Sequence, residues 1–361
     1  LLRVAILDGA RLYHLRGGRG AEQKGMGEHV RLDNRVMALK MLFDNLGKLT
    51  PSSAIAGELG VTRQGISKMV GILRDEGIPI SSVPHKGYVL EGPPGEDRFS
   101  PSWAEMLLWD CPLGHPILHF ERIESTQNPV KDLAQKGHPE GVTAVADRQT
   151  MGRGRRDRRW ESPEGGLYAS VLLRPPILPG HVQMVNLACA MAMGDAIEAR
   201  CGIKVDIKWP NDLLVGGRKL CGMLSEGAVE ADRVHHIVAG IGVNIKGSPT
   251  IQDSPQDVTS IAEEGGTLVA RHDLLAFFLR SLKHHIGILC EDRKAFINSY
   301  RGRCSTLGRR IVVSSDSGTL EGVAEDVEDE GSLLIRTSTG LLRFSAGDVR
   351  HVRPIKGGEG E

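Results

Sequence analysis

The sequence predicts an α+β protein of several unlike domains: a winged helix-turn-helix, then a mixed α/β domain with a substantial sheet, then a small SH3-like β-barrel. Three observations support this fold class. The chain has 361 residues, more than one core usually serves. Apolar residues recur with helical spacing near the start, then in alternating strand and helix patterns, then in short strands between turn residues. We therefore expect domains at 33–92, 93–304 and 305–361, after an N-terminal extension, 1–32, that we expect to be disordered.

The first domain is predicted from three helical segments and a hairpin. RVMALKMLFDNLG has apolar residues at helical spacing and a glycine stop, and SSAIAGELG and ISKMVGILRDEG are two further helices joined through Gly60. IPISSV and GYVLEG surround PHKG as two strands. This order is typical of a winged helix-turn-helix, whose second helix, near 62–76, enters the DNA groove.

The start of that helix carries side chains that donate hydrogen bonds to phosphates and base edges: Arg63, Gln64, Ser67 and Lys68. We therefore predict that they bind DNA. The alternative is a protein-interaction domain of the same shape, because residues 31–91 hold eight Lys and Arg against six Asp and Glu, which is a small basic excess.

The middle and end of the chain follow a Pro- and Gly-containing stretch at 91–101 that reads as a linker. Strands and helices then alternate, ending in one long helix from His272 towards Tyr300. The tail has short strands separated by DSG, DEG and STG turns. The expected strands are 117–123, 142–148, 167–174, 204–209, 219–227, 235–244, 309–315, 319–327, 332–338 and 341–347, and the expected middle helices follow Ser125-Thr126 and cover 181–199.

Composition excludes several classes of protein. The chain is 40% hydrophobic, and its 45 basic and 45 acidic residues cancel, so any nucleic-acid contact must come from a local patch. The longest apolar stretch, 182–193, is too short to span a bilayer, so we expect no membrane contact. Six scattered cysteines without CxxC pairs indicate reduced thiols in the cytoplasm and no disulfide or zinc framework.

Three motifs in the middle domain indicate chemistry. MGRGRRDRRW, 151–160, has five arginines, which bind phosphate oxygens, and glycines that let backbone N–H groups approach an anion. In KWPND, 208–212, the amide of Asn211 suits an adenine edge. A hairpin turn at Gly216-Gly217 leads into the strand of GRKLCGMLSE, 217–226. On this strand Lys219 alternates with apolar neighbours, which is unusual unless it meets a negative charge. The first two also have plainer interpretations: a solvated basic loop or nucleic-acid patch, and an Asx turn.

Together with GIGVN, 240–244, these motifs suit the activation of a carboxylate by a nucleotide, without a Ser or Cys nucleophile or a metal cluster. The histidine pairs 235–236 and 284–285 have no partners at metal-ligand spacing, and we expect them to be structural.

RQTMGRGRRDRRW, KWPNDLL, GRKLCGML and GIGVN closely resemble the motifs of bacterial biotin protein ligases, in the family's order. The domain order resembles the two-function form, a ligase that also represses the biotin operon, and the resemblance covers about 33–355. It implies a class II synthetase-like ligase domain. It also implies that biotin and MgATP give biotinyl-5′-AMP and pyrophosphate, and that the biotinyl group passes to a lysine of the biotin carboxyl carrier protein of a carboxylase.

The resemblance also implies roles for individual residues. The catalytic residues are Lys219, Arg153 and Arg155; biotin is bound by Ser125, Thr126, Gln127, Gln149, Arg153, Gly154, Arg155 and Lys219; ATP is bound by Arg155, Arg156, Trp160, Asn211 and Asn244, the last two near adenine and the triphosphate or its Mg²⁺. No metal site is built by the protein itself.

Two positions depart from the family pattern. Asp157 replaces the last glycine of the usual GRGRRG loop, which affects the expected loop kinetics, and Gln127 stands where Asn is commoner. The resemblance further implies a homodimer when the adenylate is bound, which presents two winged helices to an operator. Three alternatives remain: a biotin-sensing DNA-binding regulator without catalysis, a relative that uses lipoate or another acyl group, and a ligase whose winged helix has no operator.

Overall fold

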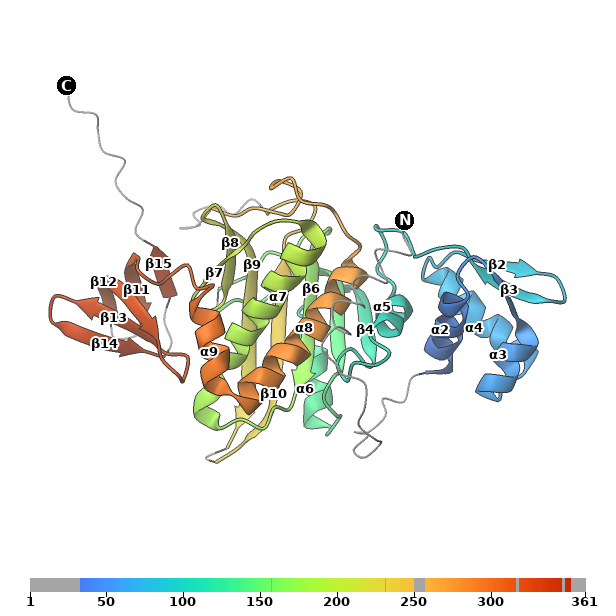
Figure 1. Cartoon of the computed structure of the whole chain (residues 1–361), viewed down its shortest axis with the longest axis horizontal. Coiled ribbons are helices and arrows are strands. Elements are labelled where there is room, and N and C mark those ends of the chain that lie inside the picture. Colours follow the sequence, from blue (N-terminus) through green and yellow to red (C-terminus); the bar gives the residue numbers. More distant parts are fainter. Residues whose placement is uncertain are drawn as a thin grey trace, which may run out of the picture. The chain divides into compact units, whose positions relative to one another are not determined.

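The computed structural model describes residues 33–156, 158–230, 232–249, 257–315, 318–345 and 348–351 (Figure 1). The expectation of a disordered extension at 1–32 lies outside the described residues, and so does Asp157. Within them, the three kinds of architecture follow one another in the predicted order, so the fold class is confirmed.

The first domain is a winged helix-turn-helix. Helix α2 (Asn34–Asp44) is capped by Asp33, whose Oδ1 accepts from Arg35 N, and α3 (Ser52–Leu59) ends at Gly60 with a φ of +63°. Helix α4 (Arg63–Asp75) begins at Thr62, whose Oγ1 accepts from Gly65 N. The wing is the predicted hairpin of β2 (Ile80–Val83) and β3 (Gly87–Leu90), to which β1 (Leu49–Pro51) adds a strand that the sequence analysis missed.

The end of the predicted linker is packed and helical. Ser100 Oγ accepts from Trp103 N and starts helix α5 (Pro101–Leu107), and Phe99 has 2% of its surface exposed. Only the earlier part of 91–101 therefore has the character of a connection. Trp103 and Met106 belong to the apolar cluster of the winged helix.

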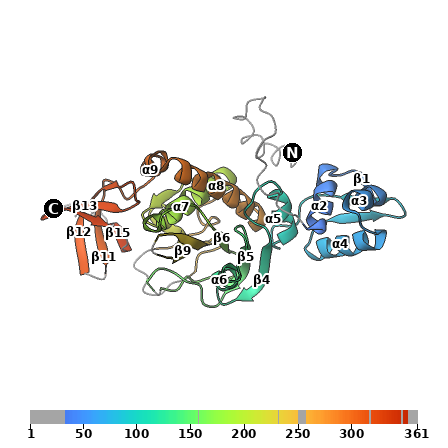
Figure 2. The ribbon, with the colours of Figure 1, turned by 90° about the horizontal axis from the view of Figure 1, so that it is seen from below.

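The middle domain has a twisted mixed sheet between two helical layers. In the described residues the sheet has seven strands, in the order β4-β5-β6-β10-β9-β8-β7, of which only β4 and β5 are a parallel pair. Figure 2 shows α7 and α8 on one face of the sheet and α6 on the other. The bounds are β4 (Ile117–Ile123), α6 (Gln127–Gln135), β5 (Thr143–Gln149), β6 (Leu167–Leu173), η1 (Pro179–His181), α7 (Met184–Cys201), β7 (Asp206–Lys208), β8 (Asp212–Val215), β9 (Arg218–Val229), β10 (Val234–Val243) and α8 (Arg271–Glu291).

The predicted single helix from His272 to Tyr300 is wrong. It is two helices, because Asp292 leaves the helical conformation and caps α9 (Arg293–Arg301) by accepting from Ala295 N at 2.9 Å. Strand β8 was also missed, because KWPND reads as a turn and hides the short strand that starts at its last residue.

The C-terminal domain is a small antiparallel sheet with the strand order β14-β13-β12-β11-β15 in the part that the structure describes. Its core joins that of the middle domain, since the Trp209 indole is buried and donates to Gly331 O at 2.9 Å, and Trp209 N donates to Thr306 Oγ1 at 3.0 Å. The strands are β11 (Arg310–Ser315), β12 (Gly318–Val327), β13 (Leu333–Thr337), β14 (Gly340–Phe344) and β15 (Asp348–His351), the last of which was not predicted.

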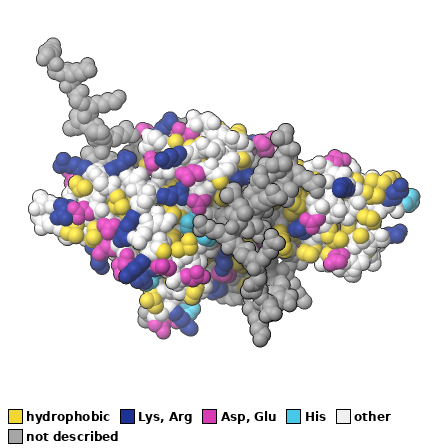
Figure 3. All heavy atoms as spheres, viewed as in Figure 1, with side chains coloured by type: hydrophobic (Ala, Val, Ile, Leu, Met, Phe, Trp, Pro, Cys, Tyr) yellow, Lys and Arg dark blue, Asp and Glu magenta, His cyan; other side chains and the backbone are white. Residues whose placement is uncertain are grey.

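The surface agrees with the balanced composition. Figure 3 shows Lys and Arg interspersed with Asp and Glu over the visible face. Among the described helices, none combines the length and the apolar character needed to cross a membrane.

One buried carboxyl makes stability depend on pH. Glu105 of α5 has 4% of its surface exposed, and this desolvation raises its pKa to about 7. An unfolded glutamate titrates near 4.5, so the folded chain binds the extra proton in the interval between these values. The stabilisation by that proton is complete below the unfolded pKa and is lost as the pH rises through about 7.

We therefore expect Glu105→Gln to remove this pH dependence. The free energy of unfolding of Glu105→Gln minus that of the wild type should rise by up to about 3 kcal/mol between pH 5 and pH 8. Urea denaturation at both pH values, with the exposed-site variant Glu58→Gln as the control, measures this difference. A difference that stays constant with pH contradicts the prediction.

Candidate active site and DNA-reading helix

A polar cluster lies where β4 and β5 end. Thr126 donates to Gln149 Oε1 through its backbone N at 2.8 Å and its hydroxyl at 3.2 Å. These bonds fix the amide orientation, so Gln149 Nε2 donates to Ser162 Oγ at 2.9 Å. The Thr126 hydroxyl also lies 2.8 Å from Ser170 Oγ. The structure thus brings the predicted Ser125, Thr126 and Gln149 together, all of them at least half-buried.

Gln127 closes this cluster against the middle of the sheet. Its Nε2 donates to Leu224 O at 3.1 Å, while its Oε1 is buried without a partner in the described residues. A Cβ at Gly240 would lie 2.7 Å from that Nε2, so the glycine lets the long side chain fit. The buried Oε1 is an acceptor that a donor group of a ligand can satisfy.

Two residues of this cluster were missed by the sequence analysis. Ser170 is a polar residue inside β6, whose seven residues are all buried, and that contrast was a signal. Ser162 follows the arginine motif and carried no signal of its own, because its contact with Gln149 spans 13 residues.

The arginine motif forms a tight loop that folds back on itself. Gly154 N donates to Arg158 O at 2.7 Å, and Trp160 N donates to Gly152 O at 2.9 Å. A Cβ at Gly152 would lie 2.4 Å from Trp160 O and 2.8 Å from Ser162 Oγ, so only glycine allows this approach. The loop therefore places Trp160 beside the Gln149 cluster.

The guanidinium groups of the loop point in different directions. Arg153 Nη2 donates to Asn128 Oδ1 at 2.8 Å, and its Nη1 lies 3.8 Å from Glu226 Oε2. Arg156, which has a φ of +54°, donates to Ser314 O of β11 at 2.7 Å. Arg153 thus lies at the polar cluster, whereas Arg156 also reaches the C-terminal sheet.

Lys219 lies beside a carboxylate and an indole. Its Nζ is 2.7 Å from Asp212 Oδ1 and 5.2 Å from the centroid of the Trp160 ring. Lys208 Nζ lies 3.8 Å from the other oxygen, Asp212 Oδ2. Asp212, of which 8% is exposed, thus has two lysine amines within 4 Å, and one of them, Lys219, also faces the Trp160 ring. Asp212 is the last residue of the KWPND motif, and the sequence alone does not indicate this role.

A turn of two glycines connects β8 to β9 and so sets the position of Lys219 on β9. Gly216 and Gly217 have φ values of +56° and +82°, as a tight hairpin between β8 and β9 requires. The pairing of β8 with β9 shifts register between Leu213 and Leu214, next to Lys219. The predicted hairpin is therefore confirmed.

Two further glycines form a floor under Trp160. A Cβ at Gly222 or Gly242 would lie 2.9 Å or 2.4 Å from atoms of the indole ring. The indole Nε1 is buried without a partner among the described residues. This floor contacts Trp160 of the arginine loop, and a Cβ at Gly222 would also lie 3.3 Å from Lys219 Cε.

The two asparagines predicted to bind ATP hold loops in place here. Asn211 Nδ2 donates to Met223 O at 2.8 Å, and Asn244 Nδ2 donates to Thr259 O at 3.0 Å. Asn244 has 1% of its surface exposed, and its Oδ1 accepts no hydrogen bond within the described ranges. Their contacts with a nucleotide remain predictions.

The predicted DNA-reading residues lie together on the first turns of α4. Arg63, Gln64, Ser67 and Lys68 are all exposed, whereas Ile66, Val70 and Leu73 on the other side are buried in the winged-helix core. Gln64, Ser67 and Lys68 line an open depression with Thr62 and Gly65.

The remaining candidate groups have structural surroundings. His285 Nε2 lies 2.7 Å from Asp195 Oδ2 and His235 Nε2 lies 2.9 Å from Glu230 Oε1. Across the described ranges no group of three or more His, Cys, Asp or Glu side chains could hold a metal ion. All six cysteines are free thiols, and five of them are buried.

Comparison with known proteins agrees with this geometry. The family models for the Biotin/lipoate A/B protein ligase family, the Biotin protein ligase C terminal domain and the HTH domain match residues 119–244, 306–352 and 37–89. The chain is 34% identical to the Bifunctional ligase/repressor BirA of Bacillus subtilis over 317 residues, which are 85% of this chain and 96% of that protein. It is 26% identical to the protein of the same name from Escherichia coli over 88% and 97% of the two chains. The biotin protein ligase of Aquifex aeolicus, solved with biotin and ATP, superposes with a TM-score of 0.56 at 26% identity, over 65% of this chain and 99% of that one.

Proposed function

This chain belongs to the family of bifunctional biotin ligase/repressors, and we propose that it activates biotin with ATP, transfers the biotinyl group to a carrier protein, and binds DNA through its winged helix. The observation that carries the proposal is the position of Trp160. Its ring lies over the Gly222–Gly242 floor beside Lys219, and its backbone holds Gly152 next to Gln149. A carboxylate bound at one cluster can therefore meet a phosphate bound at the other.

The first step joins biotin to AMP. A carboxylate oxygen of biotin attacks the α-phosphorus, the bond from that phosphorus to the bridging oxygen of pyrophosphate breaks, and pyrophosphate leaves. Negative charge grows on the phosphate oxygens, and fixed donors at that point lower the barrier. Lys219 and Arg155 supply positive charge there, and Arg153 and Gly154 close over biotin. The ureido ring of biotin is bound by Ser125, Thr126 and Gln127, and Gln149 lies beside biotin.

MgATP is the second substrate. Mg²⁺ prefers oxygen ligands and usually reaches a nucleotide site through one or two protein groups and the phosphates. Asn244 Oδ1 is buried and has no partner in the described part of the chain, so it is available as an oxygen ligand of the metal. Trp160, Asn211 and Arg156 complete the nucleotide side.

The second step moves the biotinyl group. The amine of a carrier lysine attacks the carbonyl carbon of the mixed anhydride, AMP leaves, and the amine loses a proton as the amide forms. Water competes in this reaction, so the arginine loop serves as a lid that covers the adenylate until the carrier arrives.

The proposal is tested with the full chain, biotin and α-labelled MgATP. We expect labelled biotinyl-5′-AMP that depends on biotin, followed by biotinylation of one lysine when a biotin carboxyl carrier domain is added. The same assay with lipoate in place of biotin tests whether the chain uses that alternative acyl substrate instead. A chain that binds biotin without forming adenylate is a regulator, and this outcome contradicts the ligase.

For repression, the adenylate favours a homodimer that presents two copies of α4 to a two-fold operator. The exposed donors on α4 support DNA as the partner, and the free cysteine thiols support a reducing cytoplasm as the location.

Removing one α4 cation should weaken DNA binding without affecting ligation. Lys68→Ala is expected to lower the affinity for the chain's own biotin-gene promoter by about tenfold, because one phosphate or base contact is lost. A gel shift with biotin and ATP present measures this, and Lys48→Ala is the control on the same domain. If wild type and Lys68→Ala shift the promoter alike, α4 does not read DNA.

A further inference from the structure

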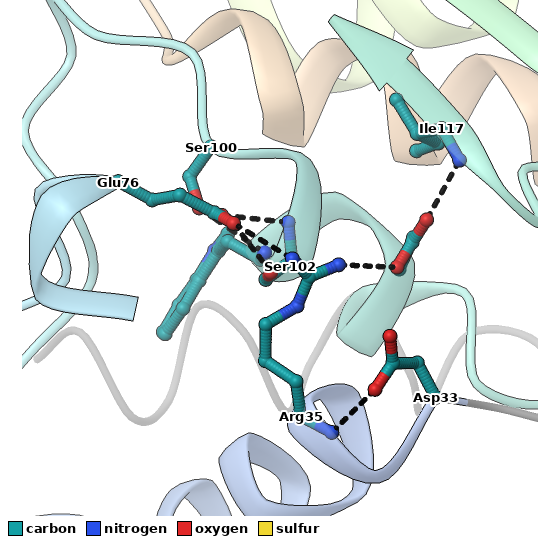
Figure 4. Close-up of polar contacts among 8 residues, drawn as sticks. Asp33, Arg35, Glu76, Ser100, Ser102 and Ile117 are labelled. Atoms are coloured by element: carbon teal, nitrogen blue, oxygen red, sulfur yellow. Dashed lines mark hydrogen bonds and ion pairs between the residues drawn. The ribbon is translucent and has the colours of Figure 1, made fainter. Parts of the chain in front are cut away.

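The C-terminal end of α4, the helix predicted to bind DNA, is hydrogen-bonded to α5. Glu76, which caps α4, accepts hydrogen bonds from Ser100 Oγ and Ser102 N, both at 2.8 Å, and from Ser102 Oγ at 2.7 Å (Figure 4). All of these donors belong to the first turn of α5 or its cap. A movement of α4 is therefore transmitted to α5 by three hydrogen bonds to one carboxylate.

Helix α5 is also packed into both neighbours. The Trp103 ring meets Phe43 of α2 edge-on, with centroids 5.6 Å apart, and His272 of α8 at 6.5 Å. The winged helix and the ligase domain thus share this short helix as a common part of their packing.

Arg35 of α2 bridges two carboxylates across this junction. Its Nη1 lies 3.7 Å from Glu76 Oε1, its Nη2 lies 3.9 Å from Glu105 Oε2, and the three side chains are 26%, 15% and 6% exposed. Asp33 Oδ1 accepts from the Arg35 backbone N, which holds the start of α2 at the same place (Figure 4). Removing Arg35 leaves two largely buried carboxylates facing each other.

Glu105 carries the contact into the catalytic sheet. Its Oε1 accepts from Ile117 N at 2.6 Å, and Ile117 is the first residue of β4 (Figure 4). Strand β4 ends at Ile123, which pairs with Gln149, and Ser125 and Thr126 follow after one residue. One seven-residue strand therefore joins the Glu105 contact to the polar cluster assigned to biotin.

We propose that Arg35, Glu76 and Glu105 form a positioning network that couples the winged helix to the biotin end of the sheet through β4. The proposal rests on the biotin assignment of the Gln149 cluster. Its consequence is that a residue of the DNA-binding domain, far in sequence from the ligase motifs, sets biotin affinity. Because binding linkage is reciprocal, biotin affects the orientation of α4 by the same route.

The test is isothermal titration of the full chain with biotin at pH 8, where Glu105 is ionised, together with the KM for biotin and kcat. Arg35→Gln should raise the dissociation constant and KM for biotin by about three- to tenfold and change kcat by less than about twofold, within the usual range of coupling between sites. Glu58→Gln, an exposed carboxylate on α3, should change neither value.

The double variant Arg35→Gln/Glu105→Gln identifies the route. It is compared with Arg35→Gln and with Glu105→Gln. If Glu105 transmits the effect of Arg35, the double variant binds biotin about as weakly as the weaker-binding of these two single variants. If the two changes in the free energy of biotin binding simply add, this role of Glu105 is overturned. Amide exchange of α2 and α4 checks that each variant is folded. Glu76→Gln, which removes the charge and keeps one of the two acceptor oxygens, replaces Arg35→Gln if that chain unfolds.

Biotin affinity within about 1.5-fold of wild type in a folded variant also overturns the coupling. A wild-type chain that fails to bind biotin refutes the proposed function instead, so the two failures are distinguishable.

Discussion

Replacing Lys219 by alanine is expected to slow the formation of biotinyl-5′-AMP by about 10²- to 10³-fold, the usual loss when one fixed donor to a developing charge is removed. Lys219 Nζ lies next to Asp212 and over the Trp160 ring, where two lysines share one carboxylate. Without it, the Asp212 carboxylate repels the incoming triphosphate, and Lys208, whose Nζ is 3.8 Å from Asp212 Oδ2, remains beside it.

The measurement is biotin-dependent release of pyrophosphate. Lys204→Ala removes an exposed lysine from the same domain and should leave the rate unchanged. The unfolding transition of Lys219→Ala reports whether the fold survives. Pyrophosphate release at the wild-type rate removes Lys219 from the catalytic residues.

Replacing Arg155 by glycine is expected to let the adenylate escape from the site. The mixed anhydride reacts with any amine that it meets, so labelling should spread from the carrier lysine to lysines of unrelated proteins, by at least about tenfold. Arg155 is half-buried in the loop that places Trp160, and removal of its side chain opens this cover and also makes the backbone more flexible.

Mass spectrometry of a mixture of carrier domain and bovine serum albumin measures this spread. Arg155→Lys keeps the charge and limits backbone freedom, so its labelling should lie between that of wild type and that of Arg155→Gly. Target selectivity that is unchanged in Arg155→Gly contradicts the lid.

The parts of the site that the sequence predicted are those with local signals. The glycine turn at 216–217 positions Lys219, and the strand that ends before Ser125 places the polar cluster at the sheet edge. Each depends on a few adjacent residues with fixed conformational preferences. The chemistry proposed for these positions comes from the resemblance to biotin protein ligases.

What the sequence did not reveal depends on contacts between distant segments. Arg156 and Ser314 are 158 residues apart, and neither gives a sign of the other. The break at Asp292 lies within a run of charged residues that also suits a continuous helix, so the sequence does not show that Asp292 caps a second helix.

The buried indole of Trp209 ties the C-terminal sheet to the segment KWPND, which holds the proposed nucleotide-binding residue Asn211. Its ring nitrogen and its backbone nitrogen both donate to residues beyond 305, and Ser305 N donates to Ile207 O at 2.8 Å. The last sixth of the polypeptide therefore supports the turn between β7 and β8 that bears Asn211. A gene shortened at that boundary would encode an enzyme with an exposed tryptophan and an unsupported strand, so selection is expected to keep the two segments in one reading frame.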